Sequence, residues 1–209
     1  MNEITLTPAG PSDLLPVAQV FTEAFPESLM HTWGRIPEVA FTSEVFRVCL
    51  DAEPDAFWVA RDGERVVGYA FTPANLSRLW STAVMRGHVA RWIWRVLAGR
   101  YRIGWHPLRI MLGNKAAFFS SALDRRYNVP ARILSIAVSP DHQGRGIASR
   151  LMERGLGYLA GHGVSRVRLE VRPDNGPAVT VYKRLGFETV AETKDSQGAW
   201  LVMIKEFRD

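Results

Sequence analysis

The second half of the chain alternates strand-like with helix-like segments, and this order constrains the fold more than any other feature. Runs of apolar, β-branched residues predict buried strands, and apolar residues at helical spacing predict the helices between them. The alternation predicts an α/β protein with a central mixed sheet and helices packed on its faces. The expected strands are 133–138, 166–171, 186–191 and 199–207, and the expected helices are 143–160 and 175–185.

The first half of the chain predicts a strand, helices and a hairpin. Residues 4–7 alternate like a strand, and Ser12 is the expected N-cap of a helix that runs to Phe25. A weaker helical pattern covers 43–50. Asp62-Gly63 then separates two strand patterns, as in a tight hairpin. The strands of this hairpin are expected at 56–61 and 65–72.

The composition is that of an ordinary globular protein. The 209 residues are 47% hydrophobic and 22% charged, which suits one domain over residues 1–209. Cys49 is the single cysteine, so no internal disulfide is expected, and no Cys/His cluster has the spacing of a metal site. The first residues do not predict a signal peptide, and no run of roughly 18 apolar residues predicts a membrane span. We therefore expect a cytoplasmic protein.

The stretch from Val138 to Ser149 is the most informative motif. A strand runs into a glycine-rich turn, with Gly144 and Gly146, that opens a helix. Such a turn exposes backbone N–H groups at the positive end of a helix dipole and favours phosphate, which Arg145 could also contact. The P-loop pattern is absent, and a dinucleotide fingerprint is almost present but has Ser149 in place of its third glycine. A turn that uses glycine only for tight packing is a further alternative.

Two motifs carry a resemblance to a known family. Gln143-Gly144-Arg145-Gly146-Ile147-Ala148 resembles the Q/R-x-x-G-x-G/A signature of the Gcn5-related N-acetyltransferase (GNAT) superfamily. Downstream, residues 170–187 resemble the second motif of that family, although Val181 stands where the family usually has leucine. The resemblance covers about residues 132–187. It implies the GNAT acyl-CoA N-acyltransferase fold for this α/β chain.

The resemblance implies acetyl-CoA as the cosubstrate and no metal. In the family the glycine-rich turn holds the pyrophosphate, and the preceding strand pairs with the pantetheine arm and supplies an oxyanion donor near Val138. Asn175 matches a residue that contacts this arm, although it also suits the start of a helix. The implied cofactor-binding residues are Ile136, Ala137, Val138, Gln143, Gly144, Arg145, Gly146, Ile147, Ala148, Ser149, Asn175 and Tyr182.

The same resemblance implies two catalytic residues. Tyr182 matches the tyrosine that protonates the departing CoA thiolate, and the alternative is a tyrosine packed in the core. Glu170 precedes it by twelve residues, the spacing found in acetyltransferases similar to the bacterial ribosomal-protein alanine acetyltransferases, where the glutamate assists deprotonation of the amine. The alternative is a glutamate paired with Arg168 or Arg172. His142, beside the turn, is interpreted as a solvated loop histidine.

Residues 76–127 stand where an ordinary family member has a short link. This insertion holds nine arginines, one lysine and one acid, a net charge of +9, which leaves −4 for the rest of a chain whose total is +5. It also holds four of the seven tryptophans. A helix is expected there, with Arg91 and Arg95 opposite an apolar face. That face comprises Met85, Val89, Trp92, Ile93, Val96 and Leu97.

Three roles for the insertion stay open from the sequence. Its apolar face could dock on the core and leave the arginines solvated. Its arginines could instead meet a phosphate or carboxylate of the acceptor. It could also lie on an anionic membrane surface as a peripheral contact, whereas nucleic acid is not the expected partner.

The sequence therefore predicts an acetyl-CoA-dependent N-acetyltransferase in which a primary amine attacks directly. The acceptor is expected to be a small molecule such as an amino sugar, and the basic insertion favours an anionic one such as a nucleotide sugar. A protein N-terminal or lysine acetyltransferase and a non-catalytic acyl-CoA-binding module are the alternatives, and a homodimer stays open.

Overall fold

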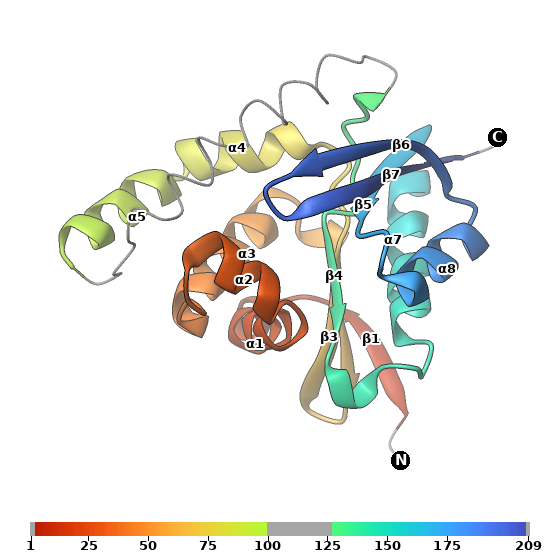
Figure 1. Cartoon of the computed structure of the whole chain (residues 1–209). Coiled ribbons are helices and arrows are strands. Elements are labelled where there is room, and N and C mark those ends of the chain that lie inside the picture. The colour runs from red at the N-terminus through yellow and green to blue at the C-terminus, as the bar shows by residue number, and fades with distance from the viewer. Residues whose placement is uncertain (1–2, 100–126, 208–209) are drawn as a thin grey trace.

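The computed structural model describes residues 3–99 and 127–207 and shows an α/β fold of two small sheets with helices on their faces (Figure 1). The expected strands and helices are present, and Pro26–Trp33 (α2) and Leu76–Met85 (α4) are two additional helices. The first half contains β1 (Ile4–Pro8), α1 (Leu14–Ala24), α2, α3 (Val39–Ala52), β2 (Phe57–Asp62) and β3 (Arg65–Phe71). The rest contains α4 (Leu76–Met85), α5 (His88–Leu97), β4 (Ser135–Val138), α7 (Ile147–Gly161), β5 (Arg166–Val171), α8 (Gly176–Arg184), β6 (Glu188–Asp195) and β7 (Gly198–Glu206).

The two sheets meet at one point. Strands β1-β2-β3-β4 form an antiparallel sheet, and β5-β7-β6 form a second antiparallel sheet. In the described residues, a single parallel bridge between Arg132 and Arg168 joins them, just before β4 begins. All other strand pairs in the described residues are antiparallel, so the expected mixture of parallel and antiparallel pairing occurs only at this bridge. Beyond it β4 bonds to β3 and β5 bonds to β7, so their facing edges are not paired with each other in the described residues, and we call the region between these two edges the opening.

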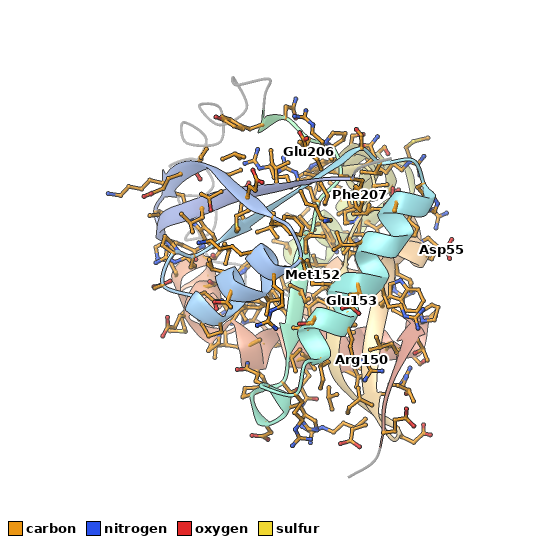
Figure 2. All side chains as sticks on the ribbon, turned by 90° about the vertical axis from the view of Figure 1, so that its right-hand side faces the viewer. Asp55, Arg150, Met152, Glu153, Glu206 and Phe207 are labelled. Carbon is orange, nitrogen blue, oxygen red and sulfur yellow. The ribbon has the colours of Figure 1, made fainter. Side chains whose placement is uncertain are left out.

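Helices cover both faces of the first sheet. On one face, α1 and α3 enclose an aromatic cluster that includes Phe46, Phe57 and Tyr69, with ring centroids 5.2 to 6.2 Å apart. On the other face α7 packs through buried residues such as Leu151, and Met152 of the same helix enters the core of the second sheet. Figure 2 looks onto this side, where α7 carries Arg150 and Glu153 beside Met152. Exposed charged residues thus alternate with buried apolar ones at helical spacing.

A glycine sets how closely α7 approaches β3. A Cβ atom at Gly155 would lie 2.5 Å from the Cγ2 atom of Thr72, which is well inside van der Waals contact. Thr72 follows β3 and is completely buried. The small residue therefore lets the helix lie against the end of the strand, and this fixes the start of α7 relative to the first sheet.

Two helix starts differ from the sequence expectation. Ser12 is not the N-cap of α1, because the chain first forms a 3-10 turn at Pro11–Asp13, and the Asp13 side chain accepts a hydrogen bond from the Gly10 N–H (2.8 Å). Helix α7 begins at Ile147 rather than at 143, because the preceding glycines adopt a left-handed conformation that interrupts the helix.

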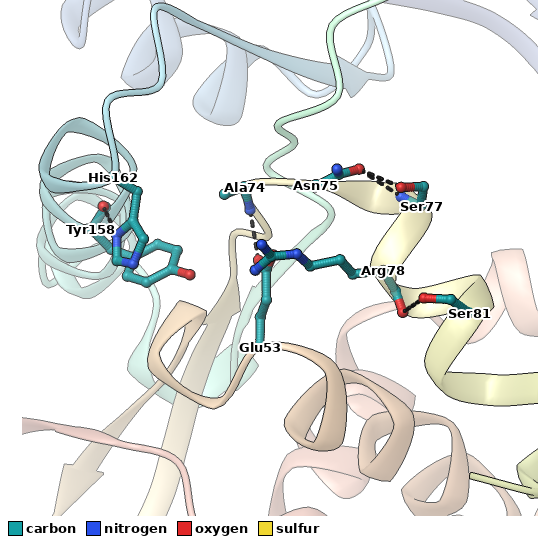
Figure 3. Close-up of polar contacts among 8 residues, drawn as sticks. All are labelled: Glu53, Ala74, Asn75, Ser77, Arg78, Ser81, Tyr158 and His162. Carbon is teal, nitrogen blue, oxygen red and sulfur yellow. Dashed lines mark hydrogen bonds and ion pairs between the residues drawn. The ribbon is translucent and has the colours of Figure 1, made fainter. Parts of the chain in front are cut away.

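The described part of the insertion forms an arm of two helices, α4 and α5, that extends away from the sheets (Figure 1). Its base is held by Glu53, a buried carboxylate that accepts a hydrogen bond from the Ala74 N–H (2.7 Å) and pairs with Arg78 at 3.5 Å (Figure 3). Gly87, at φ 71°, separates the two helices. The remaining expectations for the insertion fall on residues 100–126, outside the described residues.

The prediction of an apolar face in the arm was wrong in part. His88, Val89, Trp92 and Val96 face inward, but Ile93 and Leu97 are 56% and 81% exposed, and Met85 belongs to α4. Arg95, expected on the outside, pairs with Glu44 of α3 at 2.7 Å. Helix α5 therefore docks on α3 through polar contacts, those of Arg95 with Glu44 and of His88 with Asp51. This observation agrees with the docking alternative.

Candidate active site

The free edge of β4 is the first component of the site. Leu134 donates its N–H to Phe71 (3.0 Å) and Ser139 donates to Val67 (2.8 Å), both on the side of β3. In a regular strand, N–H groups directed to one neighbour lie an even number of residues apart. These two lie five residues apart, so the backbone contains one bulge-like irregularity between them. On its other edge, β4 has no partner strand among the described residues, and its polar backbone groups face the opening.

The glycine-rich turn is the second component, at the end of β4. Gly144 and Gly146 have φ angles of 75° and 73°, a region that disfavours residues with a Cβ atom. Backbone N–H groups from Gly144 to Ser149 have no acceptor among the described residues, and they lie at the N-terminus of α7. Oxygen atoms of a phosphate are the natural acceptors for such a set. The Gln143 side chain braces the turn by donating to the Val138 carbonyl (3.2 Å).

The other expected cofactor residues surround these two components. Arg145 is exposed and donates to the Asp141 carbonyl (3.2 Å), so its guanidinium group lies beside the turn. The Asn175 side chain accepts a hydrogen bond from the Ala178 N–H (3.2 Å) and caps α8. Residues Ala137, Val138 and Ile147 are buried, whereas Ile136, Ala148 and Ser149 are half-buried.

Tyr182 lies on α8, in the core cluster that α7, α8 and β5 form. It is buried on α8, packs edge-on against Phe187 with centroids 6.0 Å apart, and shares a cluster with Leu169 of β5. Burial raises the pKa of Tyr182 from 10.0 to about 12. The phenol therefore keeps its proton at neutral pH and is a proton donor.

Glu170 lies on the opposite side. Successive residues of a strand point to opposite faces, so Glu170 points away from the face on which Leu169 meets Tyr182. Its Oε1 atom accepts from Arg168 and lies 3.5 Å from a guanidinium nitrogen of Arg132. The pairing expected with Arg168 is thus present. The one considered with Arg172 is not, because Arg172 pairs with Asp174 at 3.7 Å.

The arrangement separates a phenol from a carboxylate. Tyr182 packs on the face of β5 that carries Leu169, and Glu170 points to the opposite face of the same strand. Half of Glu170 is exposed, since its side chain retains 45% of its accessible surface. This geometry suits a transfer in which one proton is given on one face and another is removed on the opposite face.

Sequence reasoning missed several residues of the site region. Arg132 was not singled out, because its proximity to Glu170 depends on the bridge between the two sheets. The β6–β7 turn also reaches α2, where Ser28 donates to Gln197 (3.0 Å) and His31 contacts Ser196 (3.0 Å). No local sequence signal relates segments that are so distant in the chain.

His142 was interpreted wrongly as solvated. Only 9% of this residue is exposed, and its Nε2 atom lies 3.3 Å from Asp62 in the β2–β3 hairpin. It therefore anchors the segment before the glycine-rich turn. Within residues 3–99 and 127–207 no cluster of metal-ligating side chains occurs, and none of the helices there has the length and apolar character to cross a membrane.

Comparison with known proteins agrees with this geometry. The model of the acetyltransferase (GNAT) family matches residues 16–187. A mycothiol acetyltransferase from Saccharomonospora viridis is 35% identical over 98 residues, which are 46% of this chain and only 30% of that relative. A ribosomal protein bS18-alanine N-acetyltransferase from Salmonella typhimurium is 31% identical over 102 residues, 49% of this chain and 68% of the relative.

A solved structure shares the fold over the whole chain. It is a putative acetyltransferase from Salmonella typhimurium with its cofactor acetyl-CoA, with a TM-score of 0.60 and 14% sequence identity. The superposition covers 100% of this chain and 96% of that chain.

Proposed function

Because the chain belongs to the acetyltransferase (GNAT) family, we propose that it moves the acetyl group of acetyl-CoA directly to the primary amine of a small acceptor. One observation supports this proposal above the others. The free edge of β4 runs into a glycine-rich turn whose N–H groups have no acceptor among the described residues, and the neighbouring strand β5 carries Glu170 on the face opposite the Tyr182 cluster. A linear thioester substrate with a phosphate at its far end suits this arrangement.

In this proposal the cofactor lies along β4. The N–H groups from Gly144 to Ser149 hold the pyrophosphate, and Arg145 adds charge beside it. The backbone of 136–138 pairs with the amides of the pantetheine arm, in the manner of a neighbouring strand, and Asn175 contacts the same arm. The N–H near Val138 polarises the thioester carbonyl as its oxygen gains negative charge.

The chemical step then needs one proton removed and one supplied. The amine must be neutral to attack, so the ammonium form first releases one proton to solvent. Glu170 then accepts a proton from the nitrogen of the tetrahedral intermediate, directly or through one water. Attack on the carbonyl forms the C–N bond, and collapse of the tetrahedral intermediate breaks the C–S bond. Tyr182 gives its proton to the departing thiolate, so that the products are the acetylated amine and free CoA. Before the next cycle Glu170 releases its proton to solvent and Tyr182 regains one.

The acceptor, the domain limits and the location are also parts of the proposal. We favour a single catalytic domain over 1–209 that works in the cytoplasm on a small, anionic amine. The bS18-alanine relative supports a protein N-terminus as a second acceptor class. A non-catalytic acyl-CoA-binding module is disfavoured, because a non-catalytic chain has no need for a buried, protonated tyrosine beside the opening.

Acetyl-CoA turnover over a panel of amines tests the proposal. The panel contains amino acids, amino sugars, polyamines and short peptides, and free CoA is followed with a thiol reagent. Turnover with at least one small amine, together with its loss in Tyr182→Phe, is expected. Calorimetric titration with acetyl-CoA is the second measurement, and a protein that does not bind acetyl-CoA would contradict the whole proposal.

A further inference from the structure

We propose that Arg132 and Arg168 form a binding site for an anionic group of the acceptor, a carboxylate or a phosphate, next to Glu170. This inference rests on the proposed function and names the acceptor class. It moves the expected anion contact from the basic insertion to two arginines at the bridge between the sheets.

The contacts of the two arginines leave part of each guanidinium group unused. Arg168 donates to the Tyr127 carbonyl (2.9 Å) and to Glu170, and Arg132 approaches Glu170 at 3.5 Å. The Nε atoms of both arginines are buried without a hydrogen-bond partner. Buried donors are normally paired, so two unpaired donors in one cluster need an explanation.

The charges of the cluster do not balance either. Two guanidinium groups share one carboxylate, which leaves one buried positive charge without a counter-ion in the cluster. Burial and, to a lesser extent, the neighbouring Arg168 lower the pKa of Arg132 to about 10, against the opposing effect of Glu170. A buried charge is stabilised when an opposite charge pairs with it. A carboxylate or phosphate would supply that charge and could accept two parallel N–H bonds from a guanidinium group.

The cluster lies on the acceptor side of the opening. Arg168 and Glu170 are two residues apart in β5 and therefore share a face, the one opposite Tyr182. The Arg168 side chain is 5% exposed, whereas Arg132 and Glu170 retain 17% and 45% of their surface. An incoming anion would thus meet Arg132 first. Because the base candidate adjoins the anion site, the amine and the anionic group of the acceptor must be close together, as in an amino acid or an amino sugar phosphate.

Matched acceptor pairs and the variant Arg132→Gln test the inference. Each pair differs only in the anionic group: alanine against alaninamide for the carboxylate, and glucosamine 6-phosphate against glucosamine for the phosphate. We expect the wild type to prefer the anionic member of one pair, which also identifies the anion. In Arg132→Gln the KM of that member should rise about tenfold to a hundredfold, while the KM of the neutral member changes less than about twofold.

Two variants control for indirect effects. Arg132→Lys keeps the charge and should recover part of the loss, and Arg184→Gln removes the same charge from an exposed site on α8 and should change neither KM. Equal changes of KM for both members of a pair, or no preference in the wild type, would overturn the inference and assign the arginines a structural role.

Direct binding separates this inference from the proposed function. Inorganic phosphate and acetate are titrated calorimetrically into the wild type and Arg132→Gln in the presence of saturating CoA. Weaker binding of one anion to the variant is expected, by at least tenfold. Unchanged binding of both anions to the variant would contradict the anion site, even if the protein transfers acetyl groups. If CoA itself does not bind, the proposed function fails, and the same titrations without CoA still decide the anion site.

Discussion

The β4–β5 opening and the α4–α5 arm show two different relations between sequence and structure. In the opening, a contiguous motif places the glycines, the strand edge and the helix N-terminus within a few residues of one another. In the arm, helical spacing predicted an apolar face with arginines on the outside, but Arg95 faces inward to Glu44 while Leu97, predicted on the apolar face, is 81% exposed. A motif that requires a particular backbone conformation thus predicts local structure better than the pattern of a helix face does. Left-handed glycines leave few alternative conformations for the turn.

The largest effect is expected on kcat, when the proposed acid of the opening is removed. Tyr182→Phe removes only the hydroxyl, so kcat should fall by about a hundredfold to ten-thousandfold, with little change in the Kd of acetyl-CoA. The quantities to measure are single-turnover rates and calorimetric binding. An unchanged kcat would remove Tyr182 as the acid and leave it as a core tyrosine.

The same tyrosine gives an expectation for pH. Its pKa is raised in the folded state to about 12, so the protonated form is favoured by folding. The resulting contribution of Tyr182 to the free energy of unfolding is fully present below pH 10.0, the ordinary pKa of tyrosine. It is lost as the pH rises towards 12. The free energy of unfolding of the wild type should therefore fall more steeply over this interval than that of Tyr182→Phe, as measured by urea titration. Parallel curves would argue against a buried, protonated phenol.

A smaller effect is expected at the turn. Gly146→Ala places a Cβ atom on a residue with φ of 73°, where space is open but the backbone conformation costs about 1–2 kcal/mol. We expect the Kd of acetyl-CoA to rise about tenfold. The matched control is Gly157→Ala in α7, where no atom lies within 4 Å of the added Cβ and φ is not left-handed. Equal effects of the two substitutions would show that the turn conformation does not matter for binding.

A weaker effect is expected in the arm, on the free energy of unfolding, when its ion pair with α3 is removed. Glu44 and Arg95 are 18% and 23% exposed and pair at 2.7 Å, so a double-mutant cycle with Glu44→Gln and Arg95→Gln should give a coupling of about 1 kcal/mol in the free energy of unfolding. Acetyl transfer should be unaffected in all three proteins. A loss of turnover in Arg95→Gln alone would place the arm in the acceptor site.

The outer face of the arm should give the smallest effect. Trp94→Ser and Leu97→Gln replace side chains that are 63% and 81% exposed, so stability should change by less than about 0.5 kcal/mol. Turnover should also be unchanged, because α5 leads away from the opening (Figure 1). Binding of the wild type, but not of the double variant, to vesicles that contain phosphatidylserine would instead favour the membrane alternative for the insertion.

Local patterns predicted the strands, most helices, the turn and the Glu170–Tyr182 spacing. They could not predict that Tyr182 packs on the face of β5 opposite Glu170, because that follows from the alternation along β5 together with the position of α8. The Arg132–Glu170 contact depends on a single bridge between segments far apart in the chain, and hydrophobic periodicity contains no information about it. His142 was misjudged for the same reason, since its partner Asp62 lies in the opposite hairpin.

The single bridge between the sheets has a thermodynamic consequence. If the pantetheine arm takes the place of a strand beside β4, acetyl-CoA becomes part of the hydrogen-bonded scaffold and stabilises only the folded chain. At a hundred times its Kd, a ligand of this kind raises the free energy of unfolding by about 2.7 kcal/mol. The lifetime of the protein in a cell would then depend on the acyl-CoA concentration, and the enzyme would persist best where its cosubstrate is abundant.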